Sequence, residues 1–280
     1  MRSFCDTDRP EPTDGRSNSL RQRLMSSEPF LAFFSIIPAT EIVELAALSG
    51  FDGIILDTEH GSYGTERLPS LILAARACNI FPIVRVRCND PSLIGAALDA
   101  GAAGVLVPQI SSIQEARQAV HAARFAPQGT RGANPWVRAG RYGTMPRWFD
   151  TANDDTAILL MIEGAGGLAS LDEIMQLPDL DGIFLGPVDL SHALGVPGQI
   201  DHAVVRDAVS STVRRAANAG LAAAVFAPTA AQAKDWLACG ASFAAVGVDT
   251  SHIGQALERV VTGIRPAKRT AKFTTAPAQR

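Results

Sequence analysis

The sequence predicts an α/β protein with a (β/α)8 fold, the TIM barrel. Eight short apolar segments recur between Phe30 and Arg265, each with the length and composition of a buried parallel strand. Helical patterns separate these segments, as βαβ units require. The alternation spans roughly 235 residues, which is the size of a (β/α)8 barrel. A chain of 280 residues that is 47% hydrophobic can also bury one large core.

The eight strands are expected near residues 30–36, 52–57, 82–86, 103–108, 157–162, 181–186, 221–226 and 243–247. Residues 40–48 and 113–120 exemplify the helical patterns between them. Thr40 is expected to cap the first of these helices, and Gly50 follows its end.

The two ends and one connection fall outside this rhythm. Residues 1–28 are polar and contain proline, so we expect a disordered leader before a barrel over 29–267 and a flexible tail over 268–280. The connection over 124–155 is long and contains several arginines and aromatic residues. We expect it to form an ordered lid or a subunit contact.

Composition excludes several classes of function. A net charge of −3 gives no electrostatic footprint for nucleic acid, and no stretch approaches the roughly 20 apolar residues of a membrane span. The four cysteines lack C-x-x-C spacing, which favours small buried thiols in a reducing, cytoplasmic setting. Motifs for dinucleotides, P-loop nucleotides and serine hydrolases are absent. The partner is therefore expected to be a small molecule.

Two apolar runs each end on a carboxylate. Residues 158–162 run into Glu163, and residues 182–188 run into Asp189. The carboxyl ends of barrel strands carry the chemistry of this fold, so the two carboxylates could bind Mg²⁺ or Mn²⁺. They could equally be helix caps or charges that stabilise a helix N-terminus.

Ionisable residues also follow the second and third strands. Asp57, Glu59 and His60 occur within four residues, where His60 could act as general acid or base and Glu59 could be a solvated neighbour. Arg85 near the end of the third strand could hold an enolate or carboxylate oxygen. Arg87 would lie on the same side of that strand, and the sequence alone does not choose between the two arginines.

These residues belong to an ordered set of motifs that resembles a known family. The chain is similar to the HpcH/HpaI family of class II 2-oxo-acid aldolases, within the pyruvate/phosphoenolpyruvate barrel superfamily. The similarity spans roughly residues 30–264, and eight motifs occur in order at compatible spacing. They lie at residues 57–61, 84–85, 98–102, 107–108, 129–132, 162–163, 186–190 and 246–250.

The resemblance implies metal-dependent, reversible cleavage of a 4-hydroxy-2-oxo acid to pyruvate and an aldehyde, through a metal-bound enolpyruvate. It implies that Glu163 and Asp189 bind the divalent cation, with Mg²⁺ or Mn²⁺ expected ahead of Co²⁺ or Zn²⁺. It also implies a homo-oligomer, a hexamer or a trimer of dimers, whose last helix is exchanged between subunits.

The resemblance also assigns the remaining roles. Arg85, rather than Arg87, contacts the keto or enolate oxygen. His60 transfers a proton and is paired with Asp99 of a neighbouring subunit. Backbone groups of Gly186, Pro187 and Val188 hold the pyruvate carboxylate. Asp57 and Glu59 lie behind the residues that contact the substrate.

The chain departs from the family pattern at two positions. Met161 stands where many members have Gln, and Val188 where many have Ala or a small polar residue. Both side chains are expected to border the substrate and to alter which acceptor fits. The alternatives are a decarboxylase or lyase acting on oxaloacetate-like or CoA-linked substrates, and a non-catalytic barrel that binds an oxo acid.

Overall fold

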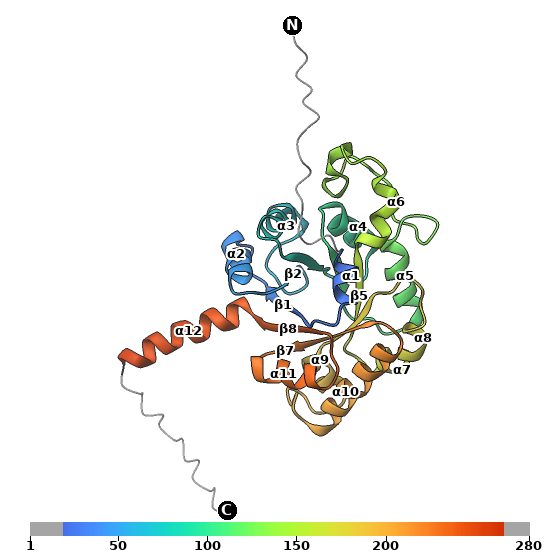
Figure 1. The fold of residues 1–280 in the computed structure, drawn as a ribbon. Coiled ribbons are helices and arrows are strands. Elements are labelled where there is room, and N and C mark those ends of the chain that lie inside the picture. Colours follow the sequence, from blue (N-terminus) through green and yellow to red (C-terminus); the bar gives the residue numbers. More distant parts are fainter. Residues whose placement is uncertain (1–18, 266–280) are drawn as a thin grey trace, which may run out of the picture.

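The computed structural model describes residues 19–265 and shows a closed barrel of eight parallel strands surrounded by helices (Figure 1). Each strand pairs with the next in sequence, and β8 pairs with β1. The predicted fold is therefore confirmed, and every predicted strand overlaps an observed one. The strands are β1 (Phe30–Ser35), β2 (Gly53–Asp57), β3 (Phe81–Arg85), β4 (Gly104–Val107), β5 (Ala157–Ile162), β6 (Gly182–Leu185), β7 (Ala222–Ala227) and β8 (Phe243–Val248).

Helices follow the strands on the outside of the barrel. Thr40 is the first helical residue and Ala39 occupies the cap position, so the predicted Thr40 cap is wrong. Gly50 has the left-handed φ of +92° that ends this helix, as predicted. The helices are α1 (Leu20–Leu24), α2 (Thr40–Leu48), α3 (Leu68–Ala77), α4 (Pro91–Asp99), α5 (Ile113–Ala123), α6 (Trp148–Asp155), α7 (Ala165–Ala169), α8 (Leu171–Ile174), α9 (Pro187–Ala193), α10 (Ala203–Asn218), α11 (Ala230–Ala238) and α12 (Asp249–Ile264), with 3₁₀ segments η1 (Thr65–Arg67) and η2 (Arg138–Gly143).

Aromatic side chains fill the inside of the barrel. Phe30 and Phe184 both pack edge-on against Phe243, and Phe184 also packs against Phe34. Alanines on β7 and β8 face the same interior, which leaves room for the large rings. The interior is thus a packed core whose upper surface supports the site described below.

Helix α1 closes the amino-terminal end of the barrel. Leu20 and Leu24 are fully buried among the interior side chains, and Ser19 begins the helix with a capping box. Arg21 Nε lies 2.6 Å from the Asp181 carboxylate, which ties the helix to the barrel. The structure departs from the predicted disordered leader at Leu20–Leu24, where two leucines one helical turn apart bury a small apolar face. Residues 1–18 and the predicted tail over 268–280 lie outside the described residues.

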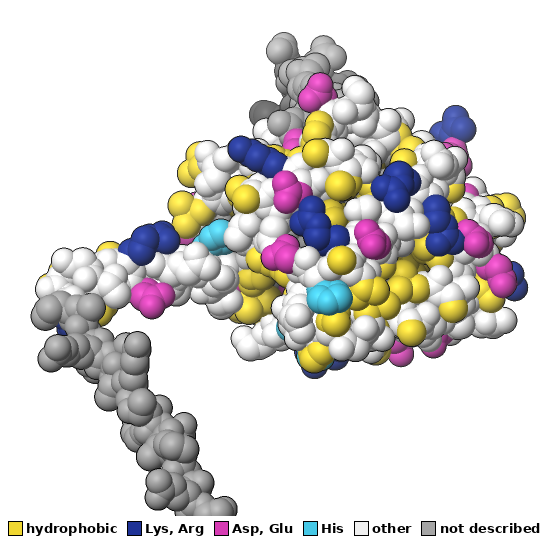
Figure 2. Space-filling view, turned by 90° about the horizontal axis from the view of Figure 1, so that it is seen from below, with side chains coloured by type: hydrophobic (Ala, Val, Ile, Leu, Met, Phe, Trp, Pro, Cys, Tyr) yellow, Lys and Arg dark blue, Asp and Glu magenta, His cyan; other side chains and the backbone are white. Residues whose placement is uncertain are grey.

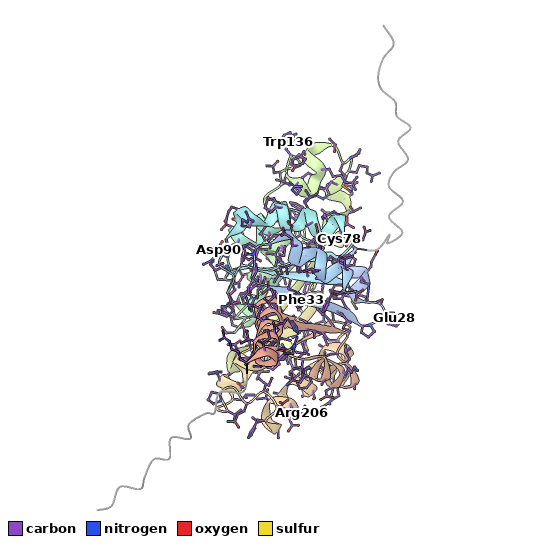
Figure 3. The ribbon with its side chains drawn as sticks, turned by 90° about the vertical axis from the view of Figure 1, so that its left-hand side faces the viewer. Glu28, Phe33, Cys78, Asp90, Trp136 and Arg206 are labelled. Atoms are coloured by element: carbon purple, nitrogen blue, oxygen red, sulfur yellow. The ribbon has the colours of Figure 1, made fainter. Side chains whose placement is uncertain are left out.

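The connection over 124–155 is folded and lies beside α4 (Figure 1). Arg124 is fully buried and binds both the Asp181 carboxylate and the carbonyl of Thr156, which fixes the base of the connection. Its tip carries the exposed Trp136 (Figure 3). Residues of this connection border the amino-terminal ends of the strands. The connection therefore lies at the end of the barrel opposite the strands' carboxyl ends and does not form a lid over them. Its expected role as a subunit contact stays a prediction.

Helix α12 projects away from the barrel (Figures 1 and 2). Beyond its first residue it is exposed along its length, including five large apolar side chains: Ile253, Leu257, Val260, Val261 and Ile264. Basic and acidic side chains are interspersed on the face shown in Figure 2. Within residues 19–265, no helix has both the length and the apolar character that crossing a membrane requires. Cys88 is exposed, so the expectation of a buried thiol is wrong there.

Candidate active site

The register of β2 and β3 brings the first two site residues together. Asp57 and Arg85 are paired positions at the carboxyl ends of these strands. Arg85 Nε donates to Asp57 Oδ1 at 2.8 Å, and Arg85 Nη2 donates to Oδ2 at 2.5 Å. The same carboxylate accepts the backbone N–H groups of Glu59 and His60. Arg87 lies beyond the end of β3 and is exposed, so Arg85 is the arginine that the fold turns inward.

Arg85 is held as a charged group at the mouth of the barrel. Its Nη1 lies 3.1 Å from Glu59 Oε2, and its guanidinium sits 5.0 Å from the centre of the Phe34 ring. Burial opposes the charged form, but the hydrogen bonds and charges of Asp57 and Glu59 raise the pKa of Arg85 above its usual value. The site therefore contains a fixed cation and hydrogen-bond donor.

Glu163 follows β5 and is only 9% exposed. Burial raises the pKa of its carboxyl to about 7, and the negative charges of Asp189 and Glu59 add to this effect. The backbone N–H of Gln109 donates to Glu163 Oε1 at 2.8 Å, and this bond with the charge of Arg85 partly offsets the rise. The hydrogen bond from Gln109 and the charge of Arg85 therefore stabilise the buried negative charge of Glu163 only in part.

Gln109 is a site residue that sequence reasoning missed. It follows β4 with a left-handed φ of +58°, which is uncommon for a residue with a side chain. This conformation directs its backbone N–H to Glu163, while its Nε2 donates to Glu59 Oε1 at 2.8 Å. Gln109 therefore connects the Arg85 side of the mouth to the Glu163 side. The only signal in the sequence was a polar residue directly after a predicted strand.

A glycine allows the β5 and β6 ends to approach each other closely. A Cβ on Gly186 would lie 2.9 Å from Met161 Cε and 3.0 Å from Glu163 Oε2, so a side chain would displace both. Pro187 then begins α9, and Asp189 lies exposed in its first turn with Val188 beside it. Met161 faces the barrel interior, where the structure places it next to Gly186 and Glu163.

The structure does not bring His60 and Asp99 together within one chain. His60 is exposed in the segment after β2, and its imidazole makes no hydrogen bond within residues 19–265. Asp99 ends α4 and binds Arg131 at 2.6 Å. Barrel helices run antiparallel to the strands, so this end of α4 lies at the opposite edge of the barrel from His60.

The carboxylate oxygens in the barrel mouth are suitable ligands for a hard divalent cation. Carboxylate oxygens are the ligands that Mg²⁺ and Mn²⁺ prefer, and a nearby cation would relieve the repulsion between Glu163 and Asp189. The buried Oε2 of Glu59 has the Arg85 guanidinium as its ion-pair partner and makes no hydrogen bond of its own. Within the described residues no three His, Cys or acidic side chains form a ready ligand cluster. The fit is therefore to a cation that keeps open positions for water or substrate.

Comparisons with known proteins all find similarity to aldolases or to members of one aldolase/lyase family. A family model described as HpcH/HpaI aldolase/citrate lyase matches residues 31–256. A 2-keto-3-deoxy-L-rhamnonate aldolase from Klebsiella pneumoniae is 36% identical, covering 87% of this chain and 91% of its own length. A hydroxypyruvate/pyruvate aldolase from Deinococcus radiodurans is 34% identical over 93% and 94% of the two chains. A solved HpcH/HpaI family structure from Burkholderia cenocepacia is 31% identical with a TM-score of 0.84, covering 89% of this chain and all of that one.

Proposed function

Because the chain belongs to the HpcH/HpaI aldolase/citrate lyase family and is a carbon–carbon lyase, we propose that it reversibly cleaves a 4-hydroxy-2-oxo acid to pyruvate and an aldehyde. The observation that carries this proposal is the convergence of Glu163, Asp189 and Arg85 at the carboxyl ends of the strands. The named relatives are aldolases, which favours aldol cleavage over decarboxylation of an oxaloacetate-like or CoA-linked substrate.

Glu163 and Asp189 are the residues that we assign to a divalent cation, Mg²⁺ or Mn²⁺ in preference to Co²⁺ or Zn²⁺. When bound, the cation supplies a Lewis acid for the 2-oxo group of the substrate. Gln109 keeps Glu163 oriented by its backbone N–H. The first turn of α9 follows Gly186 and presents backbone N–H groups without helical partners, which suit the carboxylate of pyruvate.

Arg85 stabilises the negative charge that develops on the keto oxygen when the carbon–carbon bond breaks. Its two bonds to Asp57 hold the guanidinium before the reaction, so little reorganisation is needed. The remaining Nη1 lies near Glu59, which limits its rotation. Asp57 and Glu59 thus act through Arg85 as positioning residues.

His60 takes the proton of the C4 hydroxyl group during cleavage and returns it during synthesis. Its exposed position leaves it open to a neighbouring subunit, and we propose Asp99 of the partner subunit as its hydrogen-bond acceptor. This pairing needs a homo-oligomer, for which we propose a hexamer or a trimer of dimers. The exposed apolar face of α12 gives such an assembly a surface to bury, and exchange of this helix between subunits would cover it.

The walls around the bound acid determine which aldehyde enters. Met161 and Val188 border the Glu163–Asp189 pair, one inside the barrel and one at its rim. A thioether replaces a polar amide at Met161, so the site favours an apolar contact there. In this proposal the unpaired cysteines of the described chain fit a protein that works in the cytoplasm.

Metal removal tests the proposal. Treatment with a chelator should abolish pyruvate release from a 4-hydroxy-2-oxo acid, and added Mg²⁺ or Mn²⁺ should restore it. Glu163→Ala should lose bound metal and turnover together, whereas Glu44→Ala on the exposed face of α2 should lose neither. Full activity in protein shown to be metal-free by elemental analysis would refute the proposal.

A further inference from the structure

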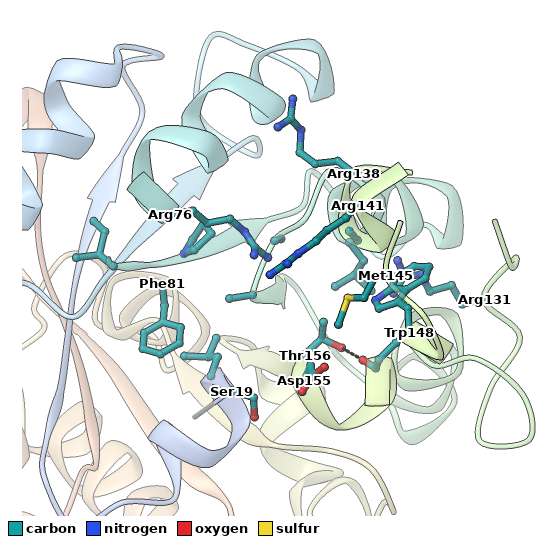
Figure 4. Close-up of a pocket in the computed structure, with 18 of the residues that line it drawn as sticks. Ser19, Arg76, Phe81, Arg131, Arg138, Arg141, Met145, Trp148, Asp155 and Thr156 are labelled. Carbon is teal, nitrogen blue, oxygen red and sulfur yellow. Dashed lines mark hydrogen bonds between the residues drawn. The ribbon is translucent and has the colours of Figure 1, made fainter. Parts of the chain in front are cut away.

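A cavity of about 330 Å³ lies at the amino-terminal ends of β3, β4 and β5, away from the site at their carboxyl ends. Helix α1 borders it on one side, the end of α4 on another, and the 124–155 connection on a third (Figure 4). Its volume is at the lower end of the range for small-molecule sites. The proposed aldolase chemistry does not use this cavity.

Four arginines line the cavity, and Asp155 is the single acidic residue among the lining side chains of the described chain. Arg76 and Arg141 extend into it from opposite sides (Figure 4). A Cβ on Gly101 would lie 3.7 Å from both Arg76 Nη2 and Arg138 Cγ, so these two side chains run close together. Arg76 donates from Nε and Nη2 to the carbonyl of Gly101, which holds its guanidinium at the cavity wall.

The arginines from the 124–155 connection are incompletely paired. Within residues 19–265, neither Arg138 nor Arg141 forms a salt bridge. Arg131 binds Asp99, but its buried Nε has no hydrogen-bond partner. Burial also lowers the pKa of Arg131 despite the neighbouring Asp99 carboxylate. Burying an arginine nitrogen without an acceptor is costly, which leaves the charge of Arg131 incompletely compensated beside the cavity.

The rest of the wall combines apolar side chains with the polar residues Ser19, Asn79 and Thr156. Among the apolar side chains, Phe81 lies on one side of the cavity and Met145 and Trp148 lie on the other, with the guanidinium groups of Arg76 and Arg141 between them (Figure 4). A site of this kind takes a small organic molecule whose charged ends bind arginine and whose carbon body packs on the wall. Planar guanidinium groups bind carboxylate and phosphate groups through two parallel hydrogen bonds.

We propose that this cavity is a second ligand site, which binds a small dianion such as a dicarboxylate or a phosphate monoester. Arg76 and Arg141 supply its principal contacts, and Arg131 adds to the positive field. The Arg138 guanidinium lies over the Tyr142 ring, away from those of Arg76 and Arg141 (Figure 4). Arg131 also holds Asp99, so an anion bound there competes with that carboxylate. If Asp99 serves His60 of the partner subunit, which rests on the proposed function, the ligand regulates proton transfer from a distance.

Calorimetry with two probe anions tests the site. Inorganic phosphate and succinate should each show saturable binding to the full chain in the presence of a chelator, and uncharged succinamide should not bind. Tighter binding of one probe identifies the class of dianion. Arg76→Ala and Arg141→Ala should each weaken binding about tenfold or more, because each removes a charge-assisted contact.

Two matched variants distinguish the cavity from other places on the chain where an anion could bind. Arg147→Ala removes an arginine of the same connection that is 86% exposed and lies outside the cavity lining, so it should leave anion affinity unchanged. Glu163→Gln should also leave it unchanged, which separates the cavity from the catalytic mouth even if the aldolase proposal fails. Affinities are compared only among variants that are fully folded at the temperature of the measurement.

Several results would overturn the proposal. Binding that survives both cavity variants, or that falls equally in Arg147→Ala, would place the anion elsewhere. An equal loss of affinity in Glu163→Gln would place it in the barrel mouth. Failure of the unmodified chain to bind either probe would also refute the second site.

Discussion

Replacing Glu163 by Gln should stabilise the metal-free protein above neutral pH while abolishing its activity. Burial raises the pKa of Glu163 from 4.5 to about 7 in the folded chain. The folded protein therefore holds this proton more tightly than the unfolded chain does. The free energy of unfolding falls as pH rises between these two values and is lowest above about 7.

The size of the effect follows from the shift. One pKa unit corresponds to about 1.4 kcal/mol, so the ionised Glu163 costs the folded state up to about 3 kcal/mol at pH 8. Glutamine has no charge to bury and can still accept the hydrogen bond from the backbone N–H of Gln109. Glu163→Gln should therefore gain up to about 3 kcal/mol at pH 8 and almost nothing at pH 5.

Urea unfolding at pH 5 and pH 8 in the presence of a chelator measures this difference. Glu44→Gln on the exposed face of α2 is the control and should change neither value. Added Mg²⁺ or Mn²⁺ should stabilise the unmodified chain but not Glu163→Gln, because only the former binds it tightly. A gain that is equal at both pH values would show that the buried carboxyl does not explain it.

Three further changes test other parts of the structure. Arg85→Lys should lower kcat/KM about 100-fold with unchanged metal affinity, because lysine cannot make both bonds to Asp57; near-normal turnover would contradict the role of the guanidinium. Leu24→Ala should lower the free energy of unfolding by about 3 kcal/mol in urea, whereas a loss below about 1 kcal/mol would show that α1 does not plug the barrel. Leu257→Asp should dissociate the proposed oligomer, as measured by light scattering, and an unchanged mass would show that α12 is not part of its interface.

The strands were predictable because a parallel strand buried on both faces leaves a continuous apolar run. Choosing between Arg85 and Arg87 was not possible from the pattern, because the choice depends on where β3 ends. The pairing of Asp57 with Arg85 shows that β3 ends at Arg85 itself, and Arg87 then turns out to solvent. The spacing of residues within β3 does not reveal how β3 pairs with β2, so the sequence could not show where β3 ends.

Other features depend on contacts between distant parts of the chain. Helix α1 was not predicted because the residues before 28 are mostly polar. Its two leucines stabilise the helix by packing against the barrel interior, a contact that the local sequence does not reveal. Gln109 became visible as a site residue through its left-handed backbone and two hydrogen bonds. The expected link between His60 and Asp99 lies beyond any single chain, because the two residues occupy opposite edges of one barrel.

The distribution of charge in the barrel mouth explains why a divalent cation suits this site. Four carboxylates share the mouth with the guanidinium of Arg85: Asp57, Glu59 and Glu163 act on Arg85 directly, and Asp189 acts on Glu163. Full ionisation would leave an excess of three negative charges among these five groups in a partly buried space. The protein alone reduces this repulsion by raising the pKa of Glu163, which keeps a proton there near neutral pH. A divalent cation would replace that proton and bind the same oxygens, so Glu163, which destabilises the metal-free fold when ionised, is a residue that the proposed reaction needs.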